Sequence, residues 1–301
     1  MWPDYSGPFS RKDFTRPQLF ACLVLRESLK FSYRKTEVFL RDVPDWLIEI
    51  ELNQVPDHNT LWRAFGELIK MPRVNKALDL LAEAEKDDLA EALAVTPLTI
   101  DGTSYEPHHS SKHYDRTCRR MHKEEEKPGK YAKKVNASRR TALRRMPKLA
   151  LAVAAATHRI LAVKVSIGIG SDAPDFAPLL EASCQRAKVR VVVADAGYDS
   201  EANHQFARQQ MNVRSIIPAK IGRPTEKAPK GRHRRNMRNR FNRRADAPMY
   251  GQRAQSETIN SMMKRNLGDY LRSLLTRRRK QELLLRCLAH NLMLGPEEGR
   301  D

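Results

Sequence analysis

The chain has few cysteines and no long apolar run, and both absences narrow what it can be. Its four cysteines lie far apart and form no C-x-x-C pair: Cys22, Cys118, Cys184 and Cys287. This usage argues against a disulfide framework and favours a reducing compartment. No apolar run approaches the roughly 18 residues of a membrane-spanning helix, and the N-terminus MWPDYSGPFSRKDF lacks the apolar region of a signal peptide. We therefore expect a cytoplasmic protein with no membrane partner.

Acidic residues are too few to balance the basic ones. The 301 residues contain 55 Lys and Arg against 36 Asp and Glu, a net charge of +19. Two segments carry much of this excess: residues 107–148 hold 14 basic residues against four acids, and residues 220–244 hold 11 against one. Charge of one sign at this density favours contact with nucleic-acid phosphates over a merely solvated surface. In the second segment the candidate DNA-binding residues are Arg234, Arg235, Arg238 and Arg240.

The first basic segment also contains four histidines and a cysteine. These are His108, His109, His113, Cys118 and His122. Two pairs have i,i+4 spacing that could suit zinc, but structural zinc sites show closer paired ligands and more thiolates. Solvated histidines are the preferred reading. Neither basic segment has an apolar period, so neither is expected to join a core.

The first third of the chain reads as helices. Asn59 is a candidate N-cap, and residues 33–68 could form a helix-turn-helix that binds DNA. A plain helical bundle that only packs or dimerises fits the same pattern. We assign residues 1–96 to a helical DNA-binding or dimerisation region, with helices expected at residues 18–31, 37–52, 60–72 and 73–95.

After Pro97 the pattern changes to alternating strands and helices. Strands are expected at residues 98–105, 149–157, 160–170, 189–194 and 214–220, the second and third forming a hairpin. The Val-rich fourth strand is typical of a strand buried on both faces. The order predicts an α/β domain over residues 97–294, with antiparallel strands first and parallel strands later, basic insertions near 107–148 and 220–244, and a tail at 295–301.

Carboxylates lie where the predicted strands end. Asp101 ends the first strand and Asp195 ends the Val-rich strand, and open α/β folds place ligands at such ends. If the helix containing Glu257 packs beside them, three acids converge and need a counter-ion. Divalent Mg²⁺ prefers such oxygen ligands, and two ions there would suit phosphoryl transfer. By contrast, Asp172, Asp175 and Asp199 are read as helix or turn caps.

The stretch YGQRAQSETINSMMKRNLG, residues 250–268, has the length of a helix. Asp246 is a candidate N-cap, and Gly268 lies where the helix would end. At 100° per residue its charged side chains share one face with a tyrosine and a serine: Tyr250, Arg253, Glu257, Ser261 and Lys264. Taken alone, such a stripe is typical of exposed i,i+4 ion pairs.

The residues of this stripe resemble a known family. Tyr250, Arg253, Glu257 and Lys264 match the Y-x2-R-x3-E-x6-K motif of the DDE transposases of bacterial and archaeal insertion sequences. IDGT at 100–103 and ADAGYD at 194–199 are similar to the flanks of that family's first two catalytic aspartates. The resemblance covers roughly residues 97–294, including EL at 282–283 and AHNL at 289–292, and PDHNTLWR resembles the segment before the catalytic domain.

The resemblance implies a ribonuclease-H-like mixed sheet flanked by helices and preceded by an all-α region. It implies that Asp101, Asp195 and Glu257 bind two Mg²⁺ or Mn²⁺ ions. Cleavage at the ends of a mobile element and attack of the freed 3′-hydroxyl on target DNA follow from the same resemblance. It further implies that Tyr250, Arg253 and Lys264 contact DNA.

The partners implied are the terminal inverted repeats, target DNA and a second copy in a synaptic homodimer, with the protein on the nucleoid when bound. Two alternatives remain: a DNA-binding protein that has lost catalysis, and a nuclease of the same fold. The basic, His-rich loop after Asp101 departs from the family pattern, which leaves the role of residues 107–148 open.

Overall fold

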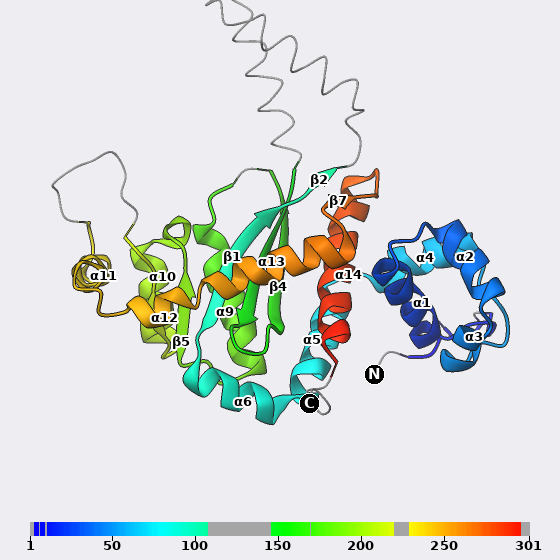
Figure 1. The fold of residues 1–301 in the computed structure, drawn as a ribbon, viewed down its shortest axis with the longest axis horizontal. Coiled ribbons are helices and arrows are strands. Elements are labelled where there is room, and N and C mark those ends of the chain that lie inside the picture. Colours follow the sequence, from blue (N-terminus) through cyan, green and yellow to red (C-terminus); the bar gives the residue numbers. More distant parts are fainter. Residues whose placement is uncertain are drawn as a thin grey trace, which may run out of the picture.

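The computed structural model describes residues 3–5, 7–9, 11–107, 146–168, 170–219 and 229–295. A central sheet carries helices on both faces, and a group of helices from the N-terminal part lies to one side of it (Figure 1). The histidine and cysteine cluster at 108–122, and most of the first basic segment, fall outside the described residues, so the readings of them stay untested.

Helices fill the chain before the first strand, as expected, but their bounds differ. They are α1 (Arg16–Ser28), α2 (Tyr33–Asp42), α3 (Asp45–Glu49), α4 (His58–Leu68), α5 (Met71–Ala84) and α6 (Lys86–Val95). The helix expected at 37–52 is broken at Pro44, which lacks the backbone N–H of a helix interior. The helix expected at 73–95 is likewise two helices that meet at Glu85. Asn59 is not the N-cap of α4: Asp57 is, and its carboxylate accepts the backbone N–H of Thr60 at 2.5 Å.

The sheet has the mixed directions predicted from the sequence. Its strands are β1 (Leu98–Ser104), β3 (Pro147–Ala154), β4 (Ile160–Ile167), β5 (Val191–Ala194) and β6 (Arg214–Ile216), in the order β4-β3-β1-β5-β6. The β3–β4 hairpin and the β1–β3 pair are antiparallel, whereas β1–β5 and β5–β6 are parallel. A separate short pair joins β2 (Glu106–Pro107) to β7 (Tyr270–Leu271). The five-stranded sheet with flanking helices is the expected ribonuclease-H-like arrangement.

The period-2 alternation of β3 divides the core between the two faces of the sheet. Its small residues, Ala150, Ala152 and Ala154, belong to one buried cluster, which includes α9 (Ala173–Arg186) and α6. Its larger residues, Leu149, Leu151 and Val153, belong to the other. That second cluster includes α13 (Ala254–Leu267) and α14 (Thr276–Leu294) together with α1, α4 and α5. Helices on both sides of residue 97 therefore share one core.

Several elements in the second half were not foreseen. The helix expected over 250–268 is two helices, α12 (Ala247–Gly251) and α13, and the second ends at Gly268 with φ 101°. The basic segment at 220–244 contains α11 (Arg232–Asn242), and the buried side chain of Met237 corrects the expectation that this segment stays out of the core. The long helix α14 was not predicted as a helix; the sequence showed only the motifs EL at 282–283 and AHNL at 289–292, which lie within it. By contrast, the helix that the sequence EANHQFARQQM predicts at residues 201–211 is present, as α10 (Glu201–Gln205) continued by a π-helical turn, Phe206–Gln210.

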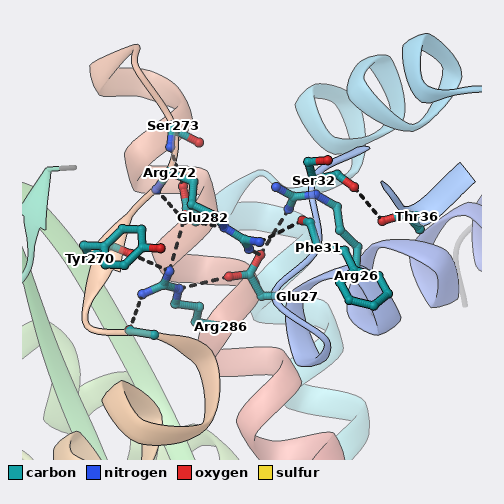
Figure 2. Close-up of polar contacts among 11 residues, drawn as sticks. Arg26, Glu27, Phe31, Ser32, Thr36, Tyr270, Arg272, Ser273, Glu282 and Arg286 are labelled. Atoms are coloured by element: carbon teal, nitrogen blue, oxygen red, sulfur yellow. Dashed lines mark hydrogen bonds and ion pairs between the residues drawn. The ribbon is translucent and has the colours of Figure 1, made fainter. Parts of the chain in front are cut away.

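A buried polar network joins α1 to α14 and to the segment around β7 (Figure 2). The carboxylate of Glu27, fully buried, pairs with Arg26 at 3.1 Å, Arg272 at 2.6 Å and Arg286 at 3.0 Å. Glu282 accepts the backbone N–H groups of Arg272 and Ser273 and pairs with Arg286 at 3.1 Å. Because each carboxylate has several charged or backbone donors, this network fixes the helical part against the sheet part.

No helix in the described ranges is both long and apolar enough to cross a membrane.

Candidate active site

Asp101 and Asp195 lie on neighbouring parallel strands at the place where their pairing stops. The last paired residues of β1 and β5 are Ile100 and Ala194, which immediately precede the two aspartates. Asp101 does not end β1, as the sequence suggested, because the strand continues to Ser104 along β3. Ile100 belongs to the core on the α9 side of the sheet. By alternation, Asp101 and Thr103 lie on the opposite side, where α13 contacts β1.

Helix α13 brings a polar stripe to that side of β1. Glu257 lies in its first turn, and Asn260 and Lys264 follow at the i+3 and i+7 positions. Asn260 donates from Nδ2 to Oδ2 of Asp101 at 3.2 Å. Lys264 donates from Nζ to the hydroxyl of Thr103 at 2.8 Å and lies 5.2 Å from the ring centre of Tyr105. Two residues of α13 are thus bonded directly to the strand that carries Asp101.

These contacts line an open pocket of about 570 Å³. Its walls come from β1, from α13 and from the turn that follows α13. The lining residues are Asp101, Gly102, Thr103, Glu257, Asn260, Ser261, Lys264, Arg265 and Asp269. The mouth is wide, and three carboxylates and two cations line it, so the pocket suits a large, charged substrate rather than a small apolar one.

The charge of Asp101 is opposed by its surroundings. Burial is the main effect that raises its pKa, and the negative charges of Asp195 and Glu257 add to it. The backbone N–H of Gly102 and the charge of Arg253 act in the other direction. Asp195 and Glu257, the two other predicted acids, are therefore near enough to raise the pKa of Asp101. A carboxylate in such a setting gains most from a nearby cation.

Glu257 and Arg253 form the i,i+4 ion pair expected of the stripe. Arg253 Nη2 lies 2.6 Å from Glu257 Oε1, and the Glu257 side chain is 58% exposed. Burial is the largest effect on Arg253 and acts to lower its pKa, but the hydrogen bond to Glu257 and the negative charges of Glu257 and Asp101 together raise the pKa. The ring of Tyr250 packs edge-on against Phe241 of α11, with centroids 4.9 Å apart. Burial is the main effect that raises the Tyr250 pKa, and Asp195 and Glu257 also raise it. All four members of the sequence motif therefore lie around the two aspartates.

The glycines beside the two aspartates make room on the other side of the sheet. The Asp195 carboxylate turns back to accept the N–H of Gly197 at 2.8 Å. A Cβ on Gly197 would lie only 2.8 Å from an Asp172 oxygen and 2.9 Å from an Asp195 oxygen. The close approach of these two carboxylates to the backbone explains why the second residue after Asp195 in ADAGYD is a glycine.

Behind the aspartates, Lys148 holds two carboxylates that sequence reasoning had read as caps. It pairs with Asp172 and, at 2.9 Å, with Asp175. Asp172 and Asp175 stand at the start of α9, as expected, at the N-cap position and in the first turn, but Asp172 makes no side-chain cap hydrogen bond. Nearby, burial and the surrounding aspartates raise the pKa of Tyr198, whose buried hydroxyl has no hydrogen-bond partner among the described residues.

The basic helix α11 divides its arginines between internal ion pairs and the surface. Arg234 binds both oxygens of Asp199, at 2.5 and 3.0 Å, so Asp199 is an ion-pair partner and not the cap expected. Arg240 pairs with Asp246 at 2.6 Å, and Asp246 also pairs with Arg214. Asp246 occupies the N-cap position of α12, as expected, but its side chain makes no cap hydrogen bond. The other two arginines differ from these. Arg235 is exposed and, among the described residues, donates to the Gly231 carbonyl alone. Arg238 is half-buried and also has a polar or ring contact.

The donor set around the pocket consists of carboxylate and amide oxygens, which match hard divalent cations. The like charges that raise the Asp101 pKa create a place where a cation would be stabilised. In the part of the chain that the structure describes, no three His, Cys, Asp or Glu side chains already form a cluster that could hold a metal ion. The Glu257 carboxylate is turned to Arg253 in this conformation.

Sequence reasoning missed the supporting residues of the site. Asn260 could have been found, because it lies three residues after Glu257 and so on the same side of the helix. Lys148 gave no such signal, since its partners are more than 20 residues away and meet it only through the fold. The blocks EL and AHNL prove to be structural: Glu282 belongs to the buried network, and the Asn291 side chain bonds both backbone groups of Ile160 at 2.9 Å.

Comparison with known proteins gave one family. Residues 98–292 match the model described as transposase DDE domain. Comparison with curated proteins and with solved structures gave no match.

Proposed function

Because the chain belongs to the transposase DDE domain family, we propose that it is an active transposase with Asp101, Asp195 and Glu257 as its catalytic carboxylates. In this proposal it cleaves DNA at the ends of an insertion sequence and joins the freed 3′-hydroxyl to target DNA. Membership of the family implies DNA as the substrate. The choice of residues and the sequence of reactions are our inference.

One observation carries the assignment of the three acids. Asp101 and Asp195 follow the last paired residues of two parallel strands, and the charges of both Asp195 and Glu257 reach Asp101. Two aspartates can stand side by side at strand ends without any catalytic role. Here the pocket that Asp101 lines is also lined by the basic residues Lys264 and Arg265. Acids for a cation and basic residues for phosphate in one open pocket support phosphoryl transfer.

The chain's own residues then have separable roles. Asp101, Asp195 and Glu257 would hold two Mg²⁺ or Mn²⁺ ions, which when bound stabilise charge on the attacking and leaving oxygens. Asn260 keeps the Asp101 carboxylate oriented through its 3.2 Å hydrogen bond. Lys264, fixed by Thr103, supplies positive charge beside the pocket for a DNA phosphate. Arg253 holds Glu257 in the absence of an ion, and Arg253 and Tyr250 would contact DNA.

The remaining parts of the proposal concern partners. Residues 1–96 would contact the terminal inverted repeats or a second copy, and α11 would add positive charge along the DNA. Two copies would bring two element ends together, in the cytoplasm and on the nucleoid. The high net charge supports a polyanionic partner.

Glu257→Gln tests the catalytic assignment. The variant keeps the shape of the side chain and loses the charge, so Mg²⁺-dependent cleavage of a duplex carrying the element's end should fall at least about 100-fold. Binding to the same duplex should change little. Glu181→Gln, on the distant helix α9, is the matched control and should cleave like the unchanged protein. Cleavage by Glu257→Gln at the normal rate would remove Glu257 from the reaction.

A further inference from the structure

A second pocket, of about 340 Å³, lies between the helical part and the segment that follows β7. It shares no lining residue with the pocket around Asp101. Aromatic rings and arginines dominate its walls: Tyr33, Trp62, Phe65, Arg26, Arg272 and Arg278. Trp62 also lines an adjacent hollow of about 470 Å³ together with Ser32, Arg34 and His58. The indole therefore stands between two hollows.

The three arginines of this pocket are not equivalent. Arg26 and Arg272 are paired with the buried carboxylate of Glu27 (Figure 2). Arg278 instead lies over the rings of Trp62 and Phe65, 4.5 and 5.4 Å from their centres, and makes one long hydrogen bond to Gln281 at 3.4 Å. Within the described ranges it forms no ion pair with a carboxylate. Partial burial and the nearby Arg277 lower its pKa. This cation has rings for neighbours and lacks an anion.

Trp62 is unusually open for so large a ring. Its exposed fraction is 48%, and Leu274 and Leu275 on the rim are exposed by 67% and 65%. Arg34, on α2, adds an exposed positive charge at the edge of the adjacent hollow. An open indole beside an unpaired guanidinium offers a stacking surface for a nucleobase and a partner for its phosphate. An apolar peptide would use the rim but would leave Arg278 uncompensated.

The pocket is connected to the candidate active site through the end of α13. Lys30, in the turn after α1, donates to the backbone carbonyl of Arg265 at 2.8 Å, and Arg265 lines the pocket around Asp101. In the same turn, the Phe31 carbonyl accepts Arg272 at 2.7 Å. DNA that leaves the active site past Arg265 would therefore meet the turn that leads to α2 and Trp62.

We infer that Trp62 and Arg278 form a subsite for one unpaired nucleotide of the bound DNA. Its base stacks on Trp62 and its phosphate is held by Arg278. This inference rests on the proposed function, since it requires DNA in the neighbouring active site.

The test uses the full chain and short duplexes that are blunt or carry a single-stranded tail at the 5′ or 3′ end, with 2-aminopurine in the tail. Stacking quenches 2-aminopurine, so the unchanged protein should quench one tail and bind that duplex about tenfold more tightly than the blunt one. Trp62→Ala should abolish both effects, and Trp62→Phe should keep most of them because a ring remains. Arg278→Gln should weaken binding of the tailed duplex. It should also lower the salt slope of that binding by about 0.9, the value of one phosphate contact. The matched control is Trp46→Ala, which removes a 38% exposed tryptophan of α3 that lines neither hollow and should change nothing.

Two kinds of result would overturn the inference. Equal affinity for blunt and tailed duplexes, with no quenching by the unchanged protein, would do so without any variant. The inference would also fail if Trp62→Ala and Trp62→Phe lost the same amount of binding affinity for the blunt and the tailed duplex. That result would show that Trp62 has a structural role. Failure to bind any duplex would instead contradict the proposed function.

Discussion

Asp101 is kept in an environment that works against its ionised form. Burial and two neighbouring carboxylates raise its pKa, and the Gly102 N–H and the charge of Arg253 offset only part of this. The arrangement costs stability in the free protein, and functional sites commonly carry such costs. The free energy of unfolding should therefore change in a predictable direction when the Asp101 charge is removed.

Asp101→Asn should stabilise the protein, and more so at neutral than at acidic pH. A raised pKa means that the folded chain holds this proton more tightly than the unfolded chain. The favourable contribution of Asp101 is therefore complete below its unfolded pKa and is lost as pH rises through the folded pKa. Urea unfolding at neutral pH should show a gain of about 0.5–2 kcal/mol. The exposed Asp42→Asn serves as control. A less stable Asp101→Asn variant, or a difference that does not depend on pH, would contradict this account.

The residues of the site could be predicted unevenly. Asp101, Asp195, Glu257 and Lys264 carry local signals, namely strand ends and a helical spacing. The Lys148 contacts with Asp172 carry none, because they arise where β3 meets α9. The interior position of Asp101 in β1 was also missed, since the strand is prolonged only by pairing with β3.

Helix α11 shows that a basic segment can be both structural and exposed. Arg234, in the first turn of α11, pairs with the fully buried Asp199 side chain, and Met237 is buried in the core. Arg235 projects outward from the next position. Charge composition predicted contact with phosphate for the whole segment, and it could not separate arginines that have an internal carboxylate from those that do not.

A pair of variants of α11 separates the two roles. Arg234→Ala removes the cation that binds both oxygens of the buried Asp199 carboxylate and should destabilise the protein by about 3–5 kcal/mol. Arg235→Ala should leave stability within about 0.5 kcal/mol and should reduce the salt slope of DNA binding by up to about 0.9. Denaturant unfolding and binding titrations over a range of salt measure these changes. An unchanged salt slope for Arg235→Ala would mean that this face of α11 does not contact phosphate.

The bounds of helices were less predictable than their existence. Periodicity correctly indicated helices before residue 97, yet Pro44 and the junction at Glu85 divide two of them. The break between α12 and α13 likewise escaped notice, because the charged stripe runs across it. Pro44 is a break that the sequence does show, whereas the junctions at Glu85 and between α12 and α13 contain no proline to mark them.

The helical part and the sheet part are held together by polar contacts as well as by a shared core. Glu27 from α1 accepts three arginines, and two of these come from the far end of the sequence. The sequence predicted a helical region and an α/β domain. It could not predict this junction, since nothing in the spacing of Glu27, Arg272 and Arg286 indicates their contact. The assignment of residues 1–96 as a separate unit stays a prediction.

Glu27→Gln should weaken the junction strongly. The variant removes the counter-charge of the buried Arg26 and leaves Glu282 alone to balance Arg272 and Arg286. The free energy of unfolding should therefore fall by about 3 kcal/mol. Glu83→Gln, whose side chain is 73% exposed in its pair with Lys86, should change stability by less than about 1 kcal/mol. Urea unfolding of both variants gives the comparison. Equal, small effects would show that the apolar core alone holds the two parts together.

In the proposed function, the three carboxylates catalyse the joining of DNA ends. The direct measurement uses pre-cut duplexes that carry the element's end and a plasmid target, and scores joined products with Mg²⁺ present. The unchanged protein should join ends with a 3′-hydroxyl and should not join ends with a 3′-deoxy terminus, while Asp195→Asn and Glu257→Gln should join neither. Joining that survives both substitutions, or that does not need the 3′-hydroxyl, would contradict the account.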